Sequence, residues 1–393
     1  MAKATVRNVD LKGKKVLMRA DFNVPQDAQL NITDDTRIRA TLFTIEYILQ
    51  KGAEKLILMS HLGRPDGKVV EKYSLKPVAD RLQELLDEPV KFLNDCVGDD
   101  VKNEIASSRE RVILLENLRF HAEEEANDSA FAKQLADLAE IYVNDAFGTA
   151  HRAHASTEGV AHFLKGVAGF LLEKEIQYLR QAMQNPTRPF MLILGGAKVS
   201  DKIGMIENLL PECDAILIGG GMAYTFLKAK GHSIGNSKLE KDKIDLAKAI
   251  LDKAKGLGTE ILLPCDHLVV DKVDAGAKTE VVGVDIPEGK IAVDVGPQTV
   301  SLFKEKLMSA KTIVWNGPLG IFEMEPFSHG SLEIAKFIST LECTSIIGGG
   351  DTAAAVAKFK LKDKMTHVST GGGASLEFLE GKILPGIAAL ADK

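Results

Sequence analysis

Four short apolar runs in the first half of the sequence are each followed by cationic or imidazole side chains. These residues are Arg19, followed by Asp21 and Asn23, in "MRADFNVP", His61 and Arg64 in "SHLGRP", Arg119 and His121 in "ENLRFH", and His151, Arg152 and His154 in "GTAHRAH". In parallel sheets the carboxyl ends of the strands meet at one edge, where ligands bind. Several guanidinium groups gathered there need a multiply charged ligand, and their planar forks suit carboxylate and phosphate.

One arginine at a strand end is most often part of a surface ion pair. The agreement of four strand ends is what predicts an anion pocket here. Arg37, at the start of a predicted helix after "DDT", can join it. Asp21 and Asn23 can accept hydrogen bonds from substrate hydroxyls or orient the arginines.

Glycines take the place of arginines in the second half. The segments after its apolar runs are "LGGAKVSDK" (194–202), "GGGMA" (219–223), "LPCD" (263–266), "WNGPLGIFE" (315–323), "GGGDTAAA" (348–355) and "STGGGAS" (369–375). Glycine lets backbone N–H groups approach a phosphate chain, and a following helix N-terminus adds a favourable dipole. Repeated glycine loops therefore predict a nucleotide site.

Three side chains in these loops suit a bound nucleotide. Lys198 and Lys202 are four residues apart, so on a helix they would share a face and could reach phosphates. Asp351 follows a triple glycine and is a candidate Mg²⁺ ligand, because Mg²⁺ prefers one or two carboxylates together with phosphate oxygens. Glu323 can accept hydrogen bonds from ribose hydroxyls.

Three common enzyme signatures are absent from the sequence. No GxxxxGK[ST] occurs, no GxGxxG follows a strand, and no GxSxG occurs. P-loop, dinucleotide-dehydrogenase and α/β-hydrolase interpretations are therefore excluded.

The elements that must position these residues alternate along the chain. Near-continuous apolar runs predict buried strands at 15–18, 55–59, 112–115, 141–143, 190–194, 215–218, 260–263, 312–315, 345–347 and 366–369. Amphipathic stretches lie between them. One is 36–52, which places Ile38, Leu42, Ile45 and Leu49 at helical spacing and stops at Gly52. The alternation predicts an α/β fold of two Rossmann-like, three-layer α/β/α domains with parallel sheets.

Composition supports two domains with different tasks. A chain of 393 residues is longer than a domain with a single hydrophobic core usually is. All twelve arginines lie in 1–188, whereas nine of the 34 glycines lie there and 25 follow. The join is expected over 171–185, a predicted helix that ends before Asn185-Pro186 and is a candidate hinge.

The net charge, the length of the apolar runs and the cysteines also argue against several classes of protein. A formal charge of −6 argues against a general nucleic-acid binder. No apolar run reaches the roughly 18 residues of a membrane span, and we expect no secretory signal. Four scattered cysteines argue against a disulfide framework and favour the cytoplasm.

An arginine-lined pocket and a glycine-lined nucleotide pocket on two domains predict phosphoryl transfer between a small anion and a nucleotide. Such chemistry rests on positioning and charge neutralisation. If the acceptor is a carboxylate, no general base is needed.

The motifs resemble those of the phosphoglycerate kinase family. Those that carry the resemblance are "RADFNVP", "SHLGRP", "ENLRF", "NDAFGTAHRAH", "GGAKVSDKI", "GGGMAYTF", "WNGPLGIFE", "GGGDTAAA" and "TGGGASLEFLEGKILPG", in the family's order from about residue 16 to 386. The resemblance implies Mg²⁺-dependent transfer between 1,3-bisphosphoglycerate and ADP, giving 3-phosphoglycerate and ATP, by a cytoplasmic, monomeric, hinge-bending enzyme with a carboxyl group as acceptor.

The resemblance also implies roles for particular residues. The phosphoglycerate site would be Asp21, Asn23, Arg37, His61, Arg64, Arg119 and Arg152. Arg37 and Lys198 would stabilise the transferring phosphoryl group. The nucleotide site would be Gly196, Lys198, Lys202, Gly220, Asn316, Pro318, Glu323, Gly349, Gly350, Asp351 and Thr352, with Asp351 holding Mg²⁺ as Mg-ATP or Mg-ADP. The glycines of 371–373 would donate backbone N–H groups to the moving phosphate.

The implied domains are a phosphoglycerate-binding domain over 1–170, a hinge helix over 171–185 and a nucleotide-binding domain over 186–379. The tail from about 380 to 393 would pack back on the first domain. Ala20 and Cys265 depart from common family choices, but neither alters a charged group. His151 and His154 match the pattern, and shaping the pocket or touching the ligand are equally open roles for them.

Two alternatives remain beside this interpretation. A non-catalytic two-domain binding protein that closes on an anion shares the outline, but it would need no triple-glycine loops. Another acyl-phosphate kinase would differ only in what the arginines enclose.

Overall fold

The computed structural model describes residues 2–393, which form two compact units. The first unit takes in the chain up to Gln177 together with Ile383–Lys393, and the second unit is Tyr178–Lys382. Helix α6 (Phe170–Gln184) begins in the first unit and ends in the second, so the helix expected before Asn185 is present. Its role as a hinge stays a prediction.

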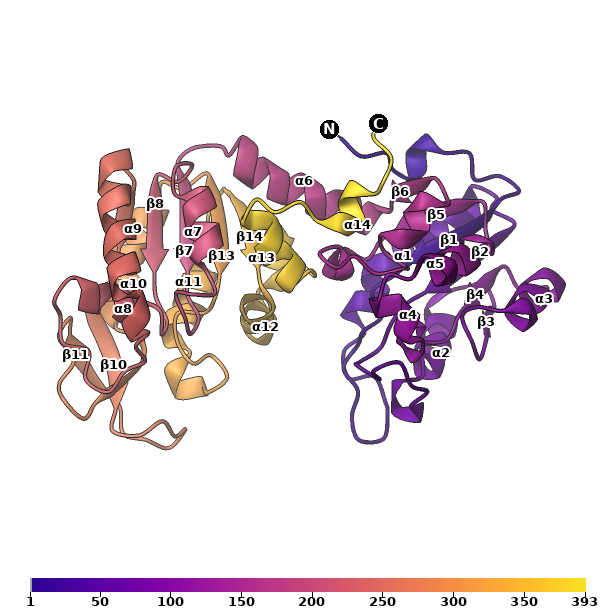
Figure 1. The fold of residues 1–393 in the computed structure, drawn as a ribbon. Helices are drawn as coiled ribbons and strands as arrows, with labels where there is room; N and C mark the ends of the chain where they lie inside the picture. The colour runs from indigo at the N-terminus through magenta and orange to yellow at the C-terminus, as the bar shows by residue number, and fades with distance from the viewer. Residues whose placement is uncertain (1) are drawn as a thin grey trace. The chain divides into compact units, whose positions relative to one another are not determined.

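The first unit is built on a six-stranded parallel sheet with the order β3-β4-β2-β1-β5-β6. Its elements in chain order are β1 (Lys15–Arg19), α1 (Thr36–Gln50), β2 (Lys55–Met59), α2 (Lys76–Leu85), β3 (Val90–Phe92), α3 (Asp99–Ser107), β4 (Val112–Leu114), α4 (Ala122–Glu125), α5 (Ser129–Ala136), β5 (Ile141–Asn144) and β6 (Gly166–Ala168), and the tail adds α14 (Pro385–Ala388). Figure 1 follows the chain through these elements.

The second unit contains a second six-stranded parallel sheet, with the order β15-β14-β13-β7-β8-β9. Its elements are β7 (Phe190–Leu194), α7 (Ile203–Leu209), β8 (Ala215–Ile218), α8 (Ala223–Ala229), α9 (Ile244–Leu257), β9 (Glu260–Leu262), β10 (Asp266–Val270), β11 (Glu280–Gly283), β12 (Ile291–Val295), α10 (Pro297–Leu307), β13 (Thr312–Asn316), α11 (His329–Ile338), β14 (Thr344–Gly348), α12 (Gly350–Lys358), β15 (His367–Val368) and α13 (Gly373–Leu379). The predicted α/β fold with two parallel sheets is therefore confirmed, and all ten predicted strands are present.

Five strands were missed by the sequence interpretation. Strands β10, β11 and β12 form a three-stranded antiparallel sheet in the second unit, and β3 and β6 lie at the edges of the first sheet. Strand β11 is largely exposed and β3 only partly buried, so neither shows the buried apolar run that marked the central strands.

Alternate strand residues face each core. In the first unit, Val16 and Met18 of β1 pack in one cluster with Ile38 and Ile45 of α1. The helical spacing read from 36–52 is therefore confirmed by burial, with Gly52 just beyond the helix end. In the second unit, Ile193 and Trp315 belong to a cluster with apolar residues of α10 and α11. Burial of both sheet faces explains the continuous apolar runs.

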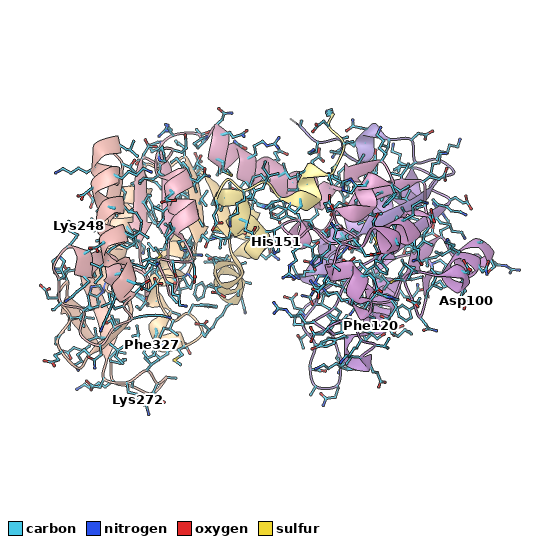
Figure 2. All side chains as sticks on the ribbon, viewed as in Figure 1. Asp100, Phe120, His151, Lys248, Lys272 and Phe327 are labelled. Carbon is cyan, nitrogen blue, oxygen red and sulfur yellow. The ribbon has the colours of Figure 1, made fainter. Side chains whose placement is uncertain are left out.

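The side chains sort by polarity as expected. Phe120 and Phe327 are buried, whereas Asp100, Lys248 and Lys272 are exposed (Figure 2). Among residues 2–393 we find no helix with the length and apolar character needed to span a membrane.

The C-terminal tail pairs with the start of the chain inside the first unit. Ala4 N–H donates to the Ala391 carbonyl at 2.8 Å, and the Asn144 side-chain amide donates to the Gly386 carbonyl at 3.1 Å. The tail is thereby bonded to the carboxyl end of β5.

Each parallel sheet has one point where the strand order reverses. In the first sheet the chain leaves β1 toward β2 and later returns on the other side of β1 at β5. In the second it leaves β7 toward β8 and returns at β13. Ligands of open α/β sheets bind beyond the carboxyl ends of the strands at such reversal points.

Candidate active site

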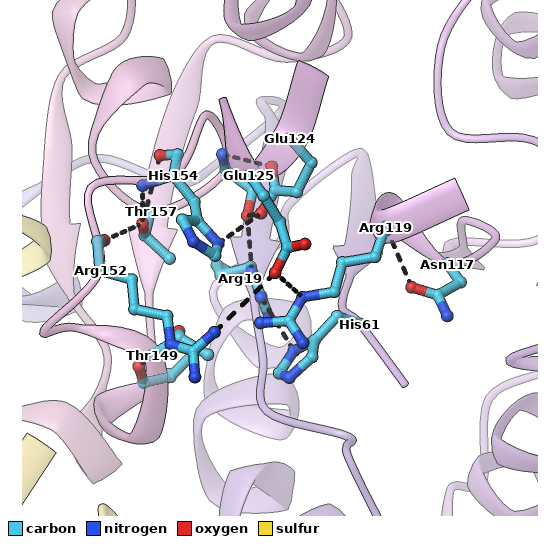
Figure 3. A network of polar contacts seen from close by, with 12 residues as sticks. Arg19, His61, Asn117, Arg119, Glu124, Glu125, Thr149, Arg152, His154 and Thr157 are labelled. Carbon is cyan, nitrogen blue, oxygen red and sulfur yellow. Dashed lines mark hydrogen bonds and ion pairs between the residues drawn. The ribbon is translucent and has the colours of Figure 1, made fainter. Parts of the chain in front are cut away.

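Three arginines and a histidine meet at the reversal point of the first unit. Arg19 ends β1, His61 follows β2, Arg119 lies in a short 3₁₀ helix after β4, and Arg152 follows β5. Strands β4, β2, β1 and β5 are neighbours in the sheet, so their carboxyl ends bring these side chains together. Figure 3 shows the four side chains converging with two glutamates between them.

Arg19 is fully buried and holds His61 in one protonation state. Its Nη2 lies 3.1 Å from His61 Nδ1, and its Nε donates to Ser156 Oγ at 2.8 Å. A guanidinium can only donate, so His61 Nδ1 accepts and the ring proton is on Nε2. Burial, and after it the positive charges of Arg19 and Arg119, lower the pKa of His61 well below its usual value. His61 is therefore a neutral imidazole with one N–H donor.

Glu125 lies between the other two arginines. Its Oε1 is 3.3 Å from Arg119 Nε and 3.9 Å from Arg152 Nη1. Arg119 also donates from Nη1 to the Gly63 carbonyl at 2.9 Å. One carboxylate is thus shared by two guanidinium groups, which leaves further N–H donors for an anionic ligand.

Glu124 supports this cluster from the interior. It is completely buried, and Ser156 donates to it from Oγ at 2.6 Å and from the backbone N–H at 2.9 Å. Because Ser156 Oγ also accepts from Arg19, the buried carboxylate and the buried guanidinium are linked through one hydroxyl. Burial raises the pKa of Glu124. No motif singled out Glu124, Glu125 or Ser156, since nothing in the sequence pairs them with distant arginines.

Asp21, Asn23 and Arg37 form a second contact set in the same unit. Arg37 Nη1 donates to both Asp21 carboxylate oxygens, at 3.0 and 3.1 Å, and to the Asn23 carbonyl at 3.2 Å. Asn23 Oδ1 accepts from Gly63 N–H at 2.9 Å, so Gly63 contacts both Asn23 and Arg119. Arg64, the next residue, is exposed.

The two histidines of the "AHRAH" segment differ in environment. Arg152 Nε donates to His151 Nε2 at 3.3 Å. His154 is buried, and burial together with Arg119 and Arg19 lowers its pKa to about 3. His154 is therefore neutral at physiological pH and lies 3.8 Å from the Glu124 carboxylate.

In the second unit, backbone groups rather than side chains line the reversal point. Gly196 N–H, after β7, donates to the Pro318 carbonyl, after β13, at 2.9 Å, and Gly220 N–H, after β8, donates to the Leu319 carbonyl at 3.0 Å. Gly220 has a φ of +63°, and a Cβ there would lie 2.7 Å from Gly196 N. Only glycine fits this close approach of two loops.

A cavity of about 390 Å³ opens beside these loops. Its lining includes five of the predicted nucleotide-site residues, namely Gly196, Gly220, Pro318, Glu323 and Asp351. Tyr224, which lies within the motif "GGGMAYTF", lines it as well, together with Lys238 and residues 291–293, to which no sequence motif pointed. The cavity has an apolar part and a few polar groups, as small-molecule sites commonly do.

The predicted lysines do not share a helix face, which corrects the sequence interpretation. Helix α7 begins at Ile203, so Lys198 lies in the preceding turns and Lys202 is the residue just before the helix. Lys198 is exposed, whereas Lys202 is partly buried, and burial lowers its pKa. Lys202 Nζ donates to the side-chain oxygen of Asn316 at the end of β13.

Asn316 and Thr352 show how the loop ends are connected. Among residues 2–393, the buried Nδ2 of Asn316 has no hydrogen-bond partner, so it is a donor available to a ligand. Thr352 is buried, and its Oγ1 accepts from Gly317 N–H at 2.6 Å, which ties α12 to the loop after β13. Gly349 and Gly350 precede Asp351 at the N-terminus of α12, and Gly372 precedes α13.

The residues present fit a magnesium ion bound together with a nucleotide. Asp351 is exposed, lines the cavity and lies in the first turn of α12, where backbone N–H groups point outward. A single accessible carboxylate beside a helix N-terminus that could accept a phosphate matches the preference of Mg²⁺ for few protein ligands plus phosphate oxygens. Asp351 would hold the ion, which would neutralise phosphate charge.

Comparisons with known proteins agree over nearly the whole chain. A family model described as phosphoglycerate kinase matches residues 6–382. The phosphoglycerate kinase of Dictyoglomus turgidum is 57% identical over 100% of both chains, and that of Thermosipho africanus is 56% identical over 100% of this chain and 99% of its own. Among solved structures, phosphoglycerate kinase from Coxiella burnetii superposes with a TM-score of 0.90 at 42% identity, and that from Pyrococcus horikoshii with 0.84 at 34%, each over 98% of both chains.

Proposed function

Because the chain belongs to the phosphoglycerate kinase family, we propose that each of its two units holds one of the two substrates of a phosphoryl transfer. The enzyme interconverts 1,3-bisphosphoglycerate and ADP with 3-phosphoglycerate and ATP, as a phosphotransferase with a carboxyl group as acceptor. We propose Mg²⁺ as its cofactor, and a monomer in the cytoplasm as its working form.

The observation that carries the proposal is the convergence of Arg19, His61, Arg119 and Arg152 at one sheet edge. A phosphoglycerate has an anionic group at each end and a hydroxyl between them, which calls for several forked donors and an acceptor. Arg119, Arg152 and exposed Arg64 supply donors, and the His61 Nε2 proton adds a neutral one. Asp21 and Asn23 supply acceptors.

The nucleotide belongs to the second unit in this proposal. Glycine loops at Gly196, Gly220 and 349–350 let the backbone approach a phosphate chain, and Lys202 and the free Asn316 amide face the same loops. Glu323 suits the ribose hydroxyls, and Thr352 acts through the loop after β13. Asp351 holds the magnesium.

The chemistry then needs little from the protein beyond charge and position. A carboxylate oxygen of 3-phosphoglycerate attacks the γ-phosphorus, an O–P bond forms, and the bond to the β-phosphate oxygen breaks. Because the attacking carboxylate is already ionised, no general base takes part. Arg37 and Lys198 neutralise the charge on the transferring group, as cationic side chains do in other phosphoryl transfers. The ligands of the two units must meet, so a closing motion about α6 belongs to the proposal.

A coupled assay tests the reaction. The protein is incubated with MgATP and 3-phosphoglycerate, and 1,3-bisphosphoglycerate is followed by NADH oxidation with glyceraldehyde-3-phosphate dehydrogenase. Turnover of the order of 1 s⁻¹ or faster that requires both Mg²⁺ and 3-phosphoglycerate is the expected result. Binding of both ligands without turnover would favour the non-catalytic binding protein, and turnover with another acyl acceptor in place of 3-phosphoglycerate would favour the other acyl-phosphate kinase.

A further inference from the structure

Three side chains of different donor type lie together in the first unit, outside the residues assigned to either substrate. The carboxylate of Asp95, the thiol of Cys96 and the imidazole of His121 have ligand atoms within 4.8 Å of one another. Asp95 and Cys96 follow β3, and His121 follows the 3₁₀ helix after β4. Strands β3 and β4 are neighbours, so the fold brings the two segments together.

Local contacts hold this cluster in place. Asp95 Oδ1 accepts from Cys96 N–H at 2.7 Å and lies 2.7 Å from His121 Nε2. The His121 ring packs against Phe131, with ring centroids 5.3 Å apart. The Asp95 carbonyl accepts from Glu116 N–H at 3.4 Å, which joins the loop to the end of β4. The three donors are therefore arranged before any ion binds.

The charges around the cluster favour a cation. Cys96 is fully buried, whereas the side chains of Asp95 and His121 are 53% and 30% exposed, so solvent meets the cluster on the side of Asp95 and His121. The carboxylates of Asp95, Glu124 and Glu116 lie close enough to act on Cys96 electrostatically, and their negative charge attracts a divalent ion.

We propose that Asp95, Cys96 and His121 form a binding site for a thiophilic divalent cation such as Zn²⁺ or Co²⁺, with the fourth coordination position open to water. Thiolate and imidazole donors select these ions over Mg²⁺ and Ca²⁺, which prefer oxygen. Three protein ligands with one open position is also the arrangement of zinc sites that exchange water. The site is separate from the proposed function and does not depend on it.

Binding rearranges protons in a balanced way. The incoming ion replaces the proton of the Cys96 thiol, which is released to solvent. The proton that His121 Nε2 donates to Asp95 is also released there, a proton is held on Nδ1 instead, and metal bonds from Nε2 and the carboxylate replace the hydrogen bond. Zinc lies about 2.0–2.3 Å from nitrogen, oxygen and sulfur ligands. Ligand atoms up to 4.8 Å apart must therefore come closer by about an ångström, whereas Asp95 Oδ1 and His121 Nε2, which lie 2.7 Å apart, must separate. Rotation of the exposed Asp95 and His121 side chains can provide this.

Cobalt is the probe that tests the site. The full-length protein is stripped of metal, kept reduced, and titrated with Co²⁺ while its near-ultraviolet and visible absorption is recorded. We expect one equivalent to produce a sulfur-to-cobalt charge-transfer band with the intense visible bands of a tetrahedral site, and Zn²⁺ to displace it. A large excess of Mg²⁺ should leave the spectrum unchanged.

Matched variants locate the signal. Cys96→Ala should abolish the charge-transfer band, whereas Cys213→Ala, which removes the buried thiol of the second unit, should keep it. Circular dichroism checks folding. Should Cys96→Ala not fold, His121→Gln keeps the thiol and should weaken Co²⁺ binding at least tenfold. Absence of the band in the wild-type protein, or a band that persists in both Cys96→Ala and His121→Gln, would overturn the proposal.

Discussion

The carboxyl edge of the first unit's sheet presents charged side chains, whereas the same edge in the second unit presents bare backbone. Arg19, Arg119 and Arg152 converge in the first, held by Glu124 and Glu125. In the second, Gly196 and Gly220 bring two loops within contact distance, and carbonyls accept from glycine N–H groups. Both edges lie at a reversal of strand order.

The difference follows from the ligands that the two units are proposed to hold. A small substrate with two anionic ends can be enclosed by long forked side chains that reach it from several strands. A polyphosphate chain is better held by many short N–H groups, and these are accessible only where no Cβ intervenes. The same sheet topology therefore supports two kinds of anion recognition, chosen by the residues at the strand ends.

The largest effect is expected where the two kinds of site must cooperate, at the transferring group. Arg37→Ala and Lys198→Ala should each lower turnover by about 10³-fold or more, because in the proposed mechanism each removes a positive side chain that neutralises the transferring group. Both side chains are at least one-third exposed, so the thermal midpoint should barely change. The coupled assay and a thermal melt measure the two quantities.

Matched control variants show whether the loss of any nearby cation lowers turnover or only the loss of Arg37 or Lys198. Arg39 lies on the same helix and, like Arg37, is paired with an aspartate, so Arg39→Ala removes a comparable cation away from the strand ends. Lys248→Ala removes an exposed lysine of α9. Both should keep near-wild-type turnover. If Arg37→Ala behaves like Arg39→Ala, the role given to Arg37 is wrong, and the same comparison applies to Lys198→Ala with Lys248→Ala.

A single methyl group added in the second unit should have a smaller effect, and only on the binding of the nucleotide. Gly220→Ala should raise the KM for ATP by about tenfold or more, because the new Cβ meets Gly196 N at 2.7 Å in addition to the roughly 1–2 kcal/mol cost of a positive φ. Affinity for 3-phosphoglycerate, measured by calorimetry without nucleotide, should not change.

Gly289→Ala separates the two costs. Gly289 also has a positive φ, +82°, but no atom lies within 4 Å of its Cβ position. This variant should lose some thermal stability and keep its KM for ATP. Equal nucleotide affinities in the two alanine variants would show that the close approach at Gly220 is not needed for binding.

In the first unit, a change of charge should act on the other substrate. Glu125→Gln removes the carboxylate that competes with a ligand for Arg119 and Arg152. One charge near a partly exposed pair is worth on the order of 1 kcal/mol, so the KM for 3-phosphoglycerate should fall about fivefold and the KM for ATP should stay constant. Glu123→Gln, an exposed change on the same short helix α4, is the control. Weaker binding of 3-phosphoglycerate by Glu125→Gln would instead mean that Glu125 orients the arginines.

Substitution of two buried aspartates, one in each unit, should have the smallest effect on catalysis. Its effect on stability should be similar in the two units. Asp145 accepts from Leu172 N–H in the first turn of α6 at 3.1 Å, and Asp294 accepts from Gly330 N–H in the first turn of α11 at 2.7 Å. Burial raises the pKa of each to about 7. Between about pH 4 and 7 the folded protein keeps protons that the unfolded chain has lost, so the free energy of unfolding falls as pH rises through this window.

Urea unfolding at several pH values measures the slope of the free energy of unfolding against pH. Asp145→Asn and Asp294→Asn should each reduce it. Asp145→Asn keeps the oxygen that accepts from Leu172 N–H, so this variant should be more stable than the wild-type protein at pH 8. Asp294 accepts hydrogen bonds with both carboxylate oxygens. Asp294→Asn therefore loses one of them and should gain less stability. A slope unaffected by both substitutions would show that neither carboxyl keeps its proton in the folded protein.

Much of this molecule was accessible from the sequence because its signals are local. Continuous apolar runs located ten strands of the two parallel sheets. The spacing of Ile38 and Ile45 located α1. Residues directly after a strand must lie at its carboxyl edge, so the arginines and glycines of both edges could be assigned before the fold was known. In the antiparallel sheet β11 is mostly exposed and shows no buried apolar run, whereas β10 and β12 are largely buried, and their short apolar runs were overlooked.

Tertiary structure decided what local signals cannot express. That Glu125 lies between Arg119 and Arg152, that Ser156 links Glu124 to Arg19, and that Arg19 fixes the proton of His61 on Nε2 depend on contacts between residues far apart in the chain. The same holds for the grouping of Asp95 and Cys96 with His121. Which side chains reach each sheet edge could be inferred from the chain alone, because strand direction is a local property. Their partners, their burial and therefore their charge states were set only when packing excluded water from between them.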